Sequence, residues 1–152
     1  MEYALILRLV IAAALGALLG LERSIAGKQA GLRTYALVSL GSCLFTVTGV
    51  LASYELSLFS GINPLQIAGS IVIGIGFIGA GLAAMRGDTN HVELTTAAGI
   101  WLAAGLGMAA GFGLYTAALT SAVLGIVIFS LLARFEHYMR TRFGSSTETN
   151  NG

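Results

Sequence analysis

Long apolar stretches, each close to the length needed to cross a lipid bilayer, constrain this chain more than any other feature. The hydrocarbon core of a bilayer is about 30 Å thick, so an α-helix needs about 20 apolar residues to cross it. The 152-residue sequence is 56% hydrophobic and only 10% charged, whereas soluble domains carry about 25% charged residues. The chain has too few charged residues for its whole surface to contact water, and much of that surface must therefore face lipid.

Five apolar stretches are separated by four shorter connectors. We predict membrane spans at Tyr3–Leu21, Tyr35–Tyr54, Ile67–Met85, Thr95–Gly111 and Leu114–Ala133. The last two form one apolar stretch that is too long for a single crossing, and the glycines of Gly111-Phe112-Gly113 can turn the chain near its middle. The alternative is four spans, with one long tilted helix in place of this hairpin.

The domain organisation follows from these spans. We expect an all-α membrane bundle in residues 1–133 and a short polar tail in residues 134–152 that is disordered beyond Phe143. With five spans, every lysine and arginine except Arg8 falls on one side of the membrane. Because cytoplasmic loops carry the excess of these residues, we predict that the N-terminus lies outside and the C-terminus in the cytoplasm.

Glycines recur along the spans. The segment Gly74-Ile75-Gly76-Phe77-Ile78-Gly79 fits the pattern G-x-G-x-x-G, but dinucleotide binding requires a preceding strand and a helix start open to solvent. This segment lies inside an apolar helix, so we expect no cofactor and interpret the glycines as helix contacts. Such smooth faces suggest a compact bundle and allow a homo-oligomer such as a homodimer. The predicted packing positions are Gly16, Gly20, Gly74, Gly76, Gly79, Gly81, Gly107 and Gly111.

Charged residues near span ends are the candidate functional groups, because charge is costly in hydrocarbon. Glu22 and Arg23 end the first span, and Arg33 and Thr34 open the second at the same depth. Glu22 can pair with Arg23 or with Arg33, or these charges can form a solvated cluster, and the residues leave these alternatives open. Arg8 lies in the outer part of the first span, where its long side chain can extend to the interface.

The third connector gathers further polar groups. Asp88, Asn90, His91 and Glu93 precede Thr95. Oxygen ligands of this kind suit Mg²⁺, but a solvated loop with a helix cap at Thr95 is the more common arrangement. The metal assignment is therefore left open. The sequence shows no Ser/His/Asp set, zinc-ligand spacing or nucleophile elbow, and we predict that the protein is not an enzyme.

Five short segments resemble a known family when taken in order. They are Gly20–Arg23, Ala30–Thr34, Gly74–Gly81, Leu94–Ala98 and Gly111–Tyr115. Together they resemble the MgtC/SapB family of bacterial inner-membrane proteins, across about residues 5 to 133.

The resemblance implies a five-span protein of the bacterial inner membrane. The family is associated with adaptation to magnesium limitation and, in some pathogens, with virulence. Its motif implies functional roles for Glu22, Arg23, Arg33, Thr34 and Asn90. We expect a short member without the soluble C-terminal domain of longer ones.

Several positions depart from the family pattern. Many members carry an acidic residue where Ser24 stands here. Asn63, Gln66 and Ser70 replace acidic, basic and glutamine positions before the third span. These replacements remove charge from the outer end of that helix.

From the resemblance we expect a regulator that contacts another inner-membrane protein, such as ATP synthase or a cation transporter, with no nucleic-acid partner. The alternative is a minimal transporter or channel for Mg²⁺ or another cation, acting as an oligomer. Ion pathways generally need intramembrane carboxylates or rings of oxygen ligands. The acidic residues between Leu5 and Ala133 all lie at span ends, which counts against a pore within one copy.

Overall fold

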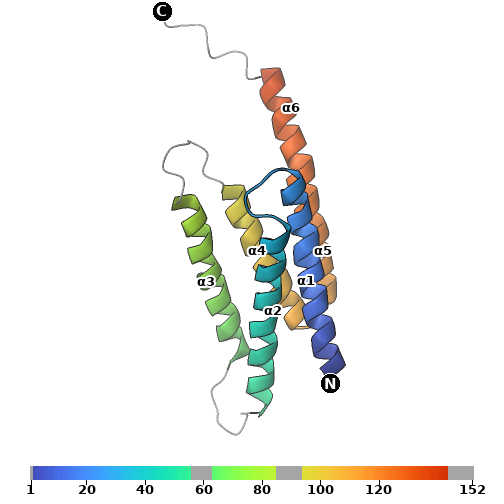
Figure 1. The fold of residues 1–152 in the computed structure, drawn as a ribbon, viewed down its shortest axis with the longest axis vertical. Helices are drawn as coiled ribbons and strands as arrows, with labels where there is room; N and C mark the ends of the chain where they lie inside the picture. Colours follow the sequence, from blue (N-terminus) through green and yellow to red (C-terminus); the bar gives the residue numbers. More distant parts are fainter. Residues whose placement is uncertain (1, 56–62, 85–93, 144–152) are drawn as a thin grey trace, which may run out of the picture.

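The computed structural model describes residues 2–55, 63–84 and 94–143 of the chain. Its elements are α1 (Glu2–Ile25), α2 (Leu32–Glu55), α3 (Pro64–Ala84), α4 (Leu94–Gly111), α5 (Tyr115–Val127), the π-helical η1 (Ile128–Leu132) and α6 (Ala133–Phe143). Within these residues, five helical segments are long and apolar enough to cross a membrane. The predicted all-α membrane bundle of five spans is confirmed (Figure 1).

The helix bounds differ from the predicted spans mainly at their ends. Helix α1 continues past Leu21 to Ile25, and the fifth span runs on through η1 into α6, because helical hydrogen bonding does not stop where hydrophobicity falls. The predicted end of the third span at Met85 and the tail beyond Phe143 lie outside the described residues. The four-span alternative is wrong, since the chain turns between α4 and α5.

Helix α2 packs closely against both α1 and α4. A Cβ atom at Gly16 of α1 would lie 2.5 Å from the carbonyl oxygen of Tyr35, and one at Gly20 would lie 2.8 Å from the Leu32 Cα. From α4, a Cβ at Gly107 would overlap the Ser39 backbone. These backbones approach so closely that only glycine fits, as expected where lipid supplies little hydrophobic drive for helix association.

Helix α4 has a second close glycine contact near its end. A Cβ at Gly111 would lie 2.8 Å from the Thr46 Cβ. A hydrogen bond adds to the contact between α1 and α2, because the Ser39 hydroxyl donates to the Ala12 carbonyl oxygen at 2.7 Å. Gly16, Gly20, Gly107 and Gly111 therefore each lie at a close approach between two helices.

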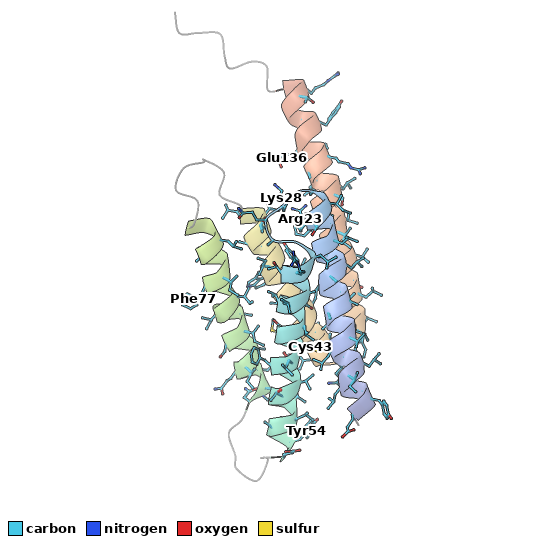
Figure 2. The ribbon with its side chains drawn as sticks, viewed as in Figure 1. Arg23, Lys28, Cys43, Tyr54, Phe77 and Glu136 are labelled. Atoms are coloured by element: carbon cyan, nitrogen blue, oxygen red, sulfur yellow. The ribbon has the colours of Figure 1, made fainter. Side chains whose placement is uncertain are left out.

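Helix α3 stands at the edge of the bundle and presents most of its surface outward. A Cβ at Gly79 would lie 3.4 Å from the Ala97 Cβ, an ordinary contact, whereas Gly74, Gly76 and Gly81 have no neighbouring atom within 4 Å among the described residues. Within the described residues, these three glycines therefore lie at no contact between helices, and their role in packing stays a prediction. The glycine pattern shows that one face of a helix lacks large side chains, but it does not show whether another helix packs against that face. Phe77, 75% exposed, points away from the other helices in Figure 2.

The turn between α4 and α5 lies deeper in the bundle than the end of α2. Gly113 adopts a φ of 80°, which glycine tolerates without strain. Thr46 of α2 packs against Gly111, and from there α2 continues to Glu55, about 13 Å at 1.5 Å per residue. Figure 1 shows the turn stopping short of the ends of α1 and α2.

The backbone N–H and C=O groups of a turn at this depth must form hydrogen bonds within the protein, because lipid offers none. Its amides bond to the last turn of α4, with Gly113 N–H donating to the Ala110 carbonyl oxygen at 3.0 Å and Leu114 N–H to that of Ala109 at 2.8 Å. The Gly111 carbonyl oxygen accepts a hydrogen bond from Arg8 Nη1 at 2.7 Å. Arg8 therefore turns inward to the hairpin, rather than extending outward as the sequence suggested.

Candidate functional site

The last turn of α1 holds an ion pair between adjacent residues. Arg23 donates from Nε to Glu22 Oε2 at 2.5 Å and from Nη2 to Glu22 Oε1 at 2.9 Å. Arg23 is only 3% exposed, while the Glu22 side chain is 18% exposed. Of the two partners that the sequence left open for Glu22, the structure shows Arg23, and the Arg33 side chain is exposed at the start of α2.

The local fold fixes this pair at the end of the bundle. Gly27, with a φ of 67°, ends α1 in a Schellman motif. In this motif the Lys28 N–H donates to the Arg23 carbonyl oxygen at 2.9 Å and the Gly27 N–H to that of Ser24 at 3.1 Å. The Ser24 hydroxyl oxygen accepts from the Leu32 N–H at 2.9 Å. Ser24 therefore ties the end of α1 to the first residue of α2.

A buried aromatic ring covers the arginine. The Cζ atom of Arg23 lies 3.9 Å from the ring centroid of Phe129, a cation–π distance. Phe129 lies in η1, the π-helical turn between α5 and α6, and such turns are frequent at functional sites. Sequence reasoning missed Phe129 because nothing distinguishes it from other apolar residues of the fifth span.

Tyr35 is a second buried group that the sequence did not single out as functional. It is fully buried, and its hydroxyl donates to the Thr96 carbonyl oxygen at 3.3 Å. It packs beside Phe129, because a Cβ at Gly99 would touch both rings. The absence of a side chain at Gly99 therefore lets α2, α4 and η1 meet directly behind the ion pair.

A pocket of about 790 Å³ opens beside the ion pair. Its wall is partly apolar, and its charged lining residues in the described chain are Glu22, Arg23, Lys28, Arg134 and Glu136. Figure 2 shows Arg23, Lys28 and Glu136 at the same end of the molecule. The pocket therefore offers both signs of charge, with the innermost carboxylate already bonded to Arg23.

The predicted polar cluster is only partly gathered in the described residues. Glu22 and Arg23 are in contact, whereas Arg33 is exposed and Thr34 half-buried in the first turn of α2. Asn90 and the other polar residues of the third connector, for which the metal assignment was left open, lie outside the described residues. Among residues that the structure does describe, no group of three His, Cys, Asp or Glu side chains could hold a metal ion.

Comparisons with known proteins give consistent matches. Residues 9–138 match the MgtC family model. The chain is 40% identical over 128 residues to YhiD of Escherichia coli (strain K12), described as a candidate magnesium transporter, covering 83% of this chain and 59% of YhiD. It is 36% identical over 130 residues to the protein SapB of Bacillus subtilis (strain 168), covering 84% of this chain and 56% of SapB.

A third relative shares a shorter segment. The protein MgtC of Salmonella typhimurium (strain LT2) is 44% identical over 96 residues, which cover 63% of this chain and 38% of MgtC. The chain thus spans little more than half of YhiD and SapB and less of MgtC. No solved structure matches it.

Proposed function

Because this chain belongs to the MgtC family, we propose that it is a bacterial inner-membrane protein that serves adaptation to magnesium limitation by regulating another membrane protein through helix contacts. Its relatives support a family-level role in magnesium adaptation or transport. The regulatory mode, the inner-membrane location and the partner are parts of the proposal. The partner is a membrane protein such as ATP synthase or a cation transporter.

The state of Glu22 is the observation that carries this proposal. A pathway for Mg²⁺ requires oxygen ligands that are free to replace the water around the ion. The Glu22 carboxylate is bonded through both oxygens to a buried arginine. The other described acidic residues are Glu2, Glu55 and Glu136, at helix ends or in α6. One copy of the described chain therefore offers no line of free carboxylates across the bundle.

The outer face of α3 is the contact surface that we propose for the partner. Ile73 and Phe77 are exposed there, and Gly76 beside them has no neighbour within the described chain. In lipid, a glycine on an apolar helix face lets a second helix approach closely. We further propose that the predicted polar positions are functional and that the ion pair at the end of the bundle holds the bundle in one arrangement. These positions are Glu22, Arg23, Arg33, Thr34 and Asn90.

The test is recovery of the partner from native membranes. A tagged wild-type chain and a Gly76→Leu variant are purified from cells grown at low magnesium, and the co-purifying membrane proteins are quantified. Gly105→Leu is the control, since Gly105 of α4 also has open space around it. We expect Gly76→Leu to lose a specific partner and slow growth at low magnesium, whereas Gly105→Leu keeps both. Equal recovery of all proteins with both variants would count against the α3 surface.

A second candidate function is cation transport by an oligomer. The description of YhiD as a candidate magnesium transporter favours it, and several copies could bring their charged pockets together. Purified chain in sealed vesicles distinguishes the two functions. Mg²⁺ uptake by the chain alone would favour transport, and the absence of uptake together with a recovered partner would favour regulation.

A further inference from the structure

Arg8 is a cation at membrane depth that lacks an ion-pair partner among the described residues. Its Nη1 donates to the Gly111 carbonyl oxygen, and its Nε is buried without a hydrogen-bond partner. A guanidinium group carries five N–H donors. The carbonyl of Gly111 satisfies one of them and supplies no negative charge.

The position of Arg8 makes the missing counter-charge costly. Arg8 lies at the level of the α4–α5 turn, and both α1 and α2 extend beyond this level. Charged side chains within a membrane span generally pair with an opposite charge or face a polar cavity. The surroundings of Arg8 should therefore contain a cavity that admits an anion.

Such a cavity lies next to Arg8. A recess of about 470 Å³ is lined by Arg8, Val50, Ser53, Tyr54, Pro64, Leu65 and Phe112. We call it the Arg8 recess. It lies at the end of the bundle opposite the Glu22–Arg23 pair, and among the described residues that line it Arg8 is the one charged residue.

The start of α3 adds to the positive potential of the Arg8 recess. Pro64 and Leu65 form the first turn of α3 and line the recess. The Leu65 N–H donates to Asn63 Oδ1 at 2.9 Å, so Asn63 caps this end. The helix dipole places partial positive charge here. The last turns of α2 (Val50, Ser53 and Tyr54) also line the recess, and their dipole end is negative and offsets that of α3. The full charge of Arg8 is therefore what favours an anion in the recess and disfavours Mg²⁺.

We propose that the Arg8 recess binds a phosphate group, either that of a phospholipid or free phosphate, on the Arg8 guanidinium. The planar guanidinium matches phosphate oxygens through paired hydrogen bonds. The apolar side chains of Val50, Leu65 and Phe112 in the wall suit the glycerol and acyl portions of a lipid. This site is separate from the charged pocket at the other end and does not depend on the proposed function.

The experiment is a lipid titration of the purified, delipidated chain by native mass spectrometry. Phosphatidylglycerol is compared with diacylglycerol, which lacks the phosphate group, and inorganic phosphate is added in a separate arm. We expect saturable binding of phosphatidylglycerol and weak binding of diacylglycerol. If inorganic phosphate displaces the lipid, the site accepts free phosphate, and if it does not, the site requires the lipid.

Single substitutions test whether phosphatidylglycerol binds in the Arg8 recess. Arg8→Gln should weaken phosphatidylglycerol binding about tenfold, as expected for the loss of hydrogen bonds to a charged group, and Arg8→Lys should retain part of the affinity. Arg33→Gln, at the opposite end, is the control and should bind as the wild type does. Ser53→Phe should fill the recess while leaving the Arg8–Gly111 hydrogen bond in place.

If Arg8→Gln fails to fold, the Ser53→Phe variant still tests whether the lipid binds in the Arg8 recess. Circular dichroism and thermal unfolding in detergent establish that each variant is folded. The proposal is overturned if Ser53→Phe, folded, binds phosphatidylglycerol as tightly as the wild type. It is also overturned if diacylglycerol and phosphatidylglycerol bind the wild type equally well.

Discussion

Arg23, at the end of α1, and Phe129, in the π-helical turn of the fifth span, are stacked with 3.9 Å between the guanidinium carbon and the ring centroid. Both residues are buried, so the contact excludes water. Because Arg23 also holds Glu22, the ring, the guanidinium and the carboxylate form one continuous set of contacts. This set joins the first and the last membrane spans at the end of the bundle that we propose to be functional.

Removing the aromatic ring should loosen this end of the bundle. Phe129→Leu keeps an apolar side chain but abolishes the cation–π contact, which is worth about 1–2 kcal/mol when it is shielded from water. We expect a lower thermal unfolding temperature in detergent. Phe135→Leu on α6, where the ring is exposed, is the matched control and should change stability little. Equal effects of the two substitutions would show that the Arg23 contact contributes nothing specific.

Neutralising Glu22 should leave a buried arginine without its counter-charge. Glu22→Gln keeps the shape of the side chain and removes the charge that strengthens both hydrogen bonds. Breaking a buried pair generally costs about 3–5 kcal/mol, but Glu22 is partly exposed and solvent screening reduces this cost to about 1–3 kcal/mol. Denaturation of single and double variants in detergent measures it.

The partner of Glu22 is identified by a double-mutant cycle. Combining Glu22→Gln with Arg23→Gln should cost less than the sum of the two single losses, because both remove the same contact. Combining Glu22→Gln with Arg33→Gln should give additive losses, since Arg33 is exposed and not bonded to Glu22. Strict additivity with Arg23 would contradict the pairing seen in the structure.

The spans could be predicted from sequence because the bilayer imposes a length and a hydrophobicity on each helix. The turn at Gly113 could be predicted because an apolar stretch long enough for two helices must reverse. The orientation of α3 could not, since its glycines and apolar residues are spread around the helix and lipid accepts them as well as protein does.

The contacts of Arg8 and Phe129 escaped prediction for a related reason. Arg8 bonds a carbonyl of α4 and Phe129 covers an arginine of α1, so each contact joins residues far apart in the chain. Periodicity describes one helix at a time and carries no information about such pairs. For Glu22 the sequence left open a pair with Arg23, a pair with Arg33 and a solvated charge cluster, and the three-dimensional arrangement shows the pair with Arg23.

Filling a close glycine contact should separate the central helices. Gly107→Leu would place a side chain against the Ser39 backbone, with which even a Cβ overlaps. Backbone cannot move aside as a flexible side chain can, so we expect reduced yield and a lower unfolding temperature in detergent. Gly81→Leu on α3 introduces the same side chain where no described atom lies within 4 Å and is the control. If Gly107→Leu were as stable as Gly81→Leu, the close approach of α2 and α4 would not be required for folding.

The orientation of the chain in the membrane is a prediction that cysteine labelling can test. The structure places Lys28 and Tyr54 at opposite ends of the bundle (Figure 2), and both are exposed. Because the cationic residues gather at the Lys28 end, the positive-inside rule predicts that this end is cytoplasmic. Cys43 is buried, and replacing it by alanine gives a background free of native cysteine for Lys28→Cys, Tyr54→Cys and Arg142→Cys.

A membrane-impermeant maleimide added to intact cells should label only the Tyr54→Cys variant. Lys28→Cys and Arg142→Cys should react only after the membrane is permeabilised. These two positions must behave alike, since an even number of spans, α2 to the fifth, separates them. Labelling of Lys28→Cys and Arg142→Cys in intact cells, with Tyr54→Cys protected, would reverse the orientation and move the Arg8 recess to the cytoplasmic side. Labelling of only one of those two positions would contradict the five-span topology itself.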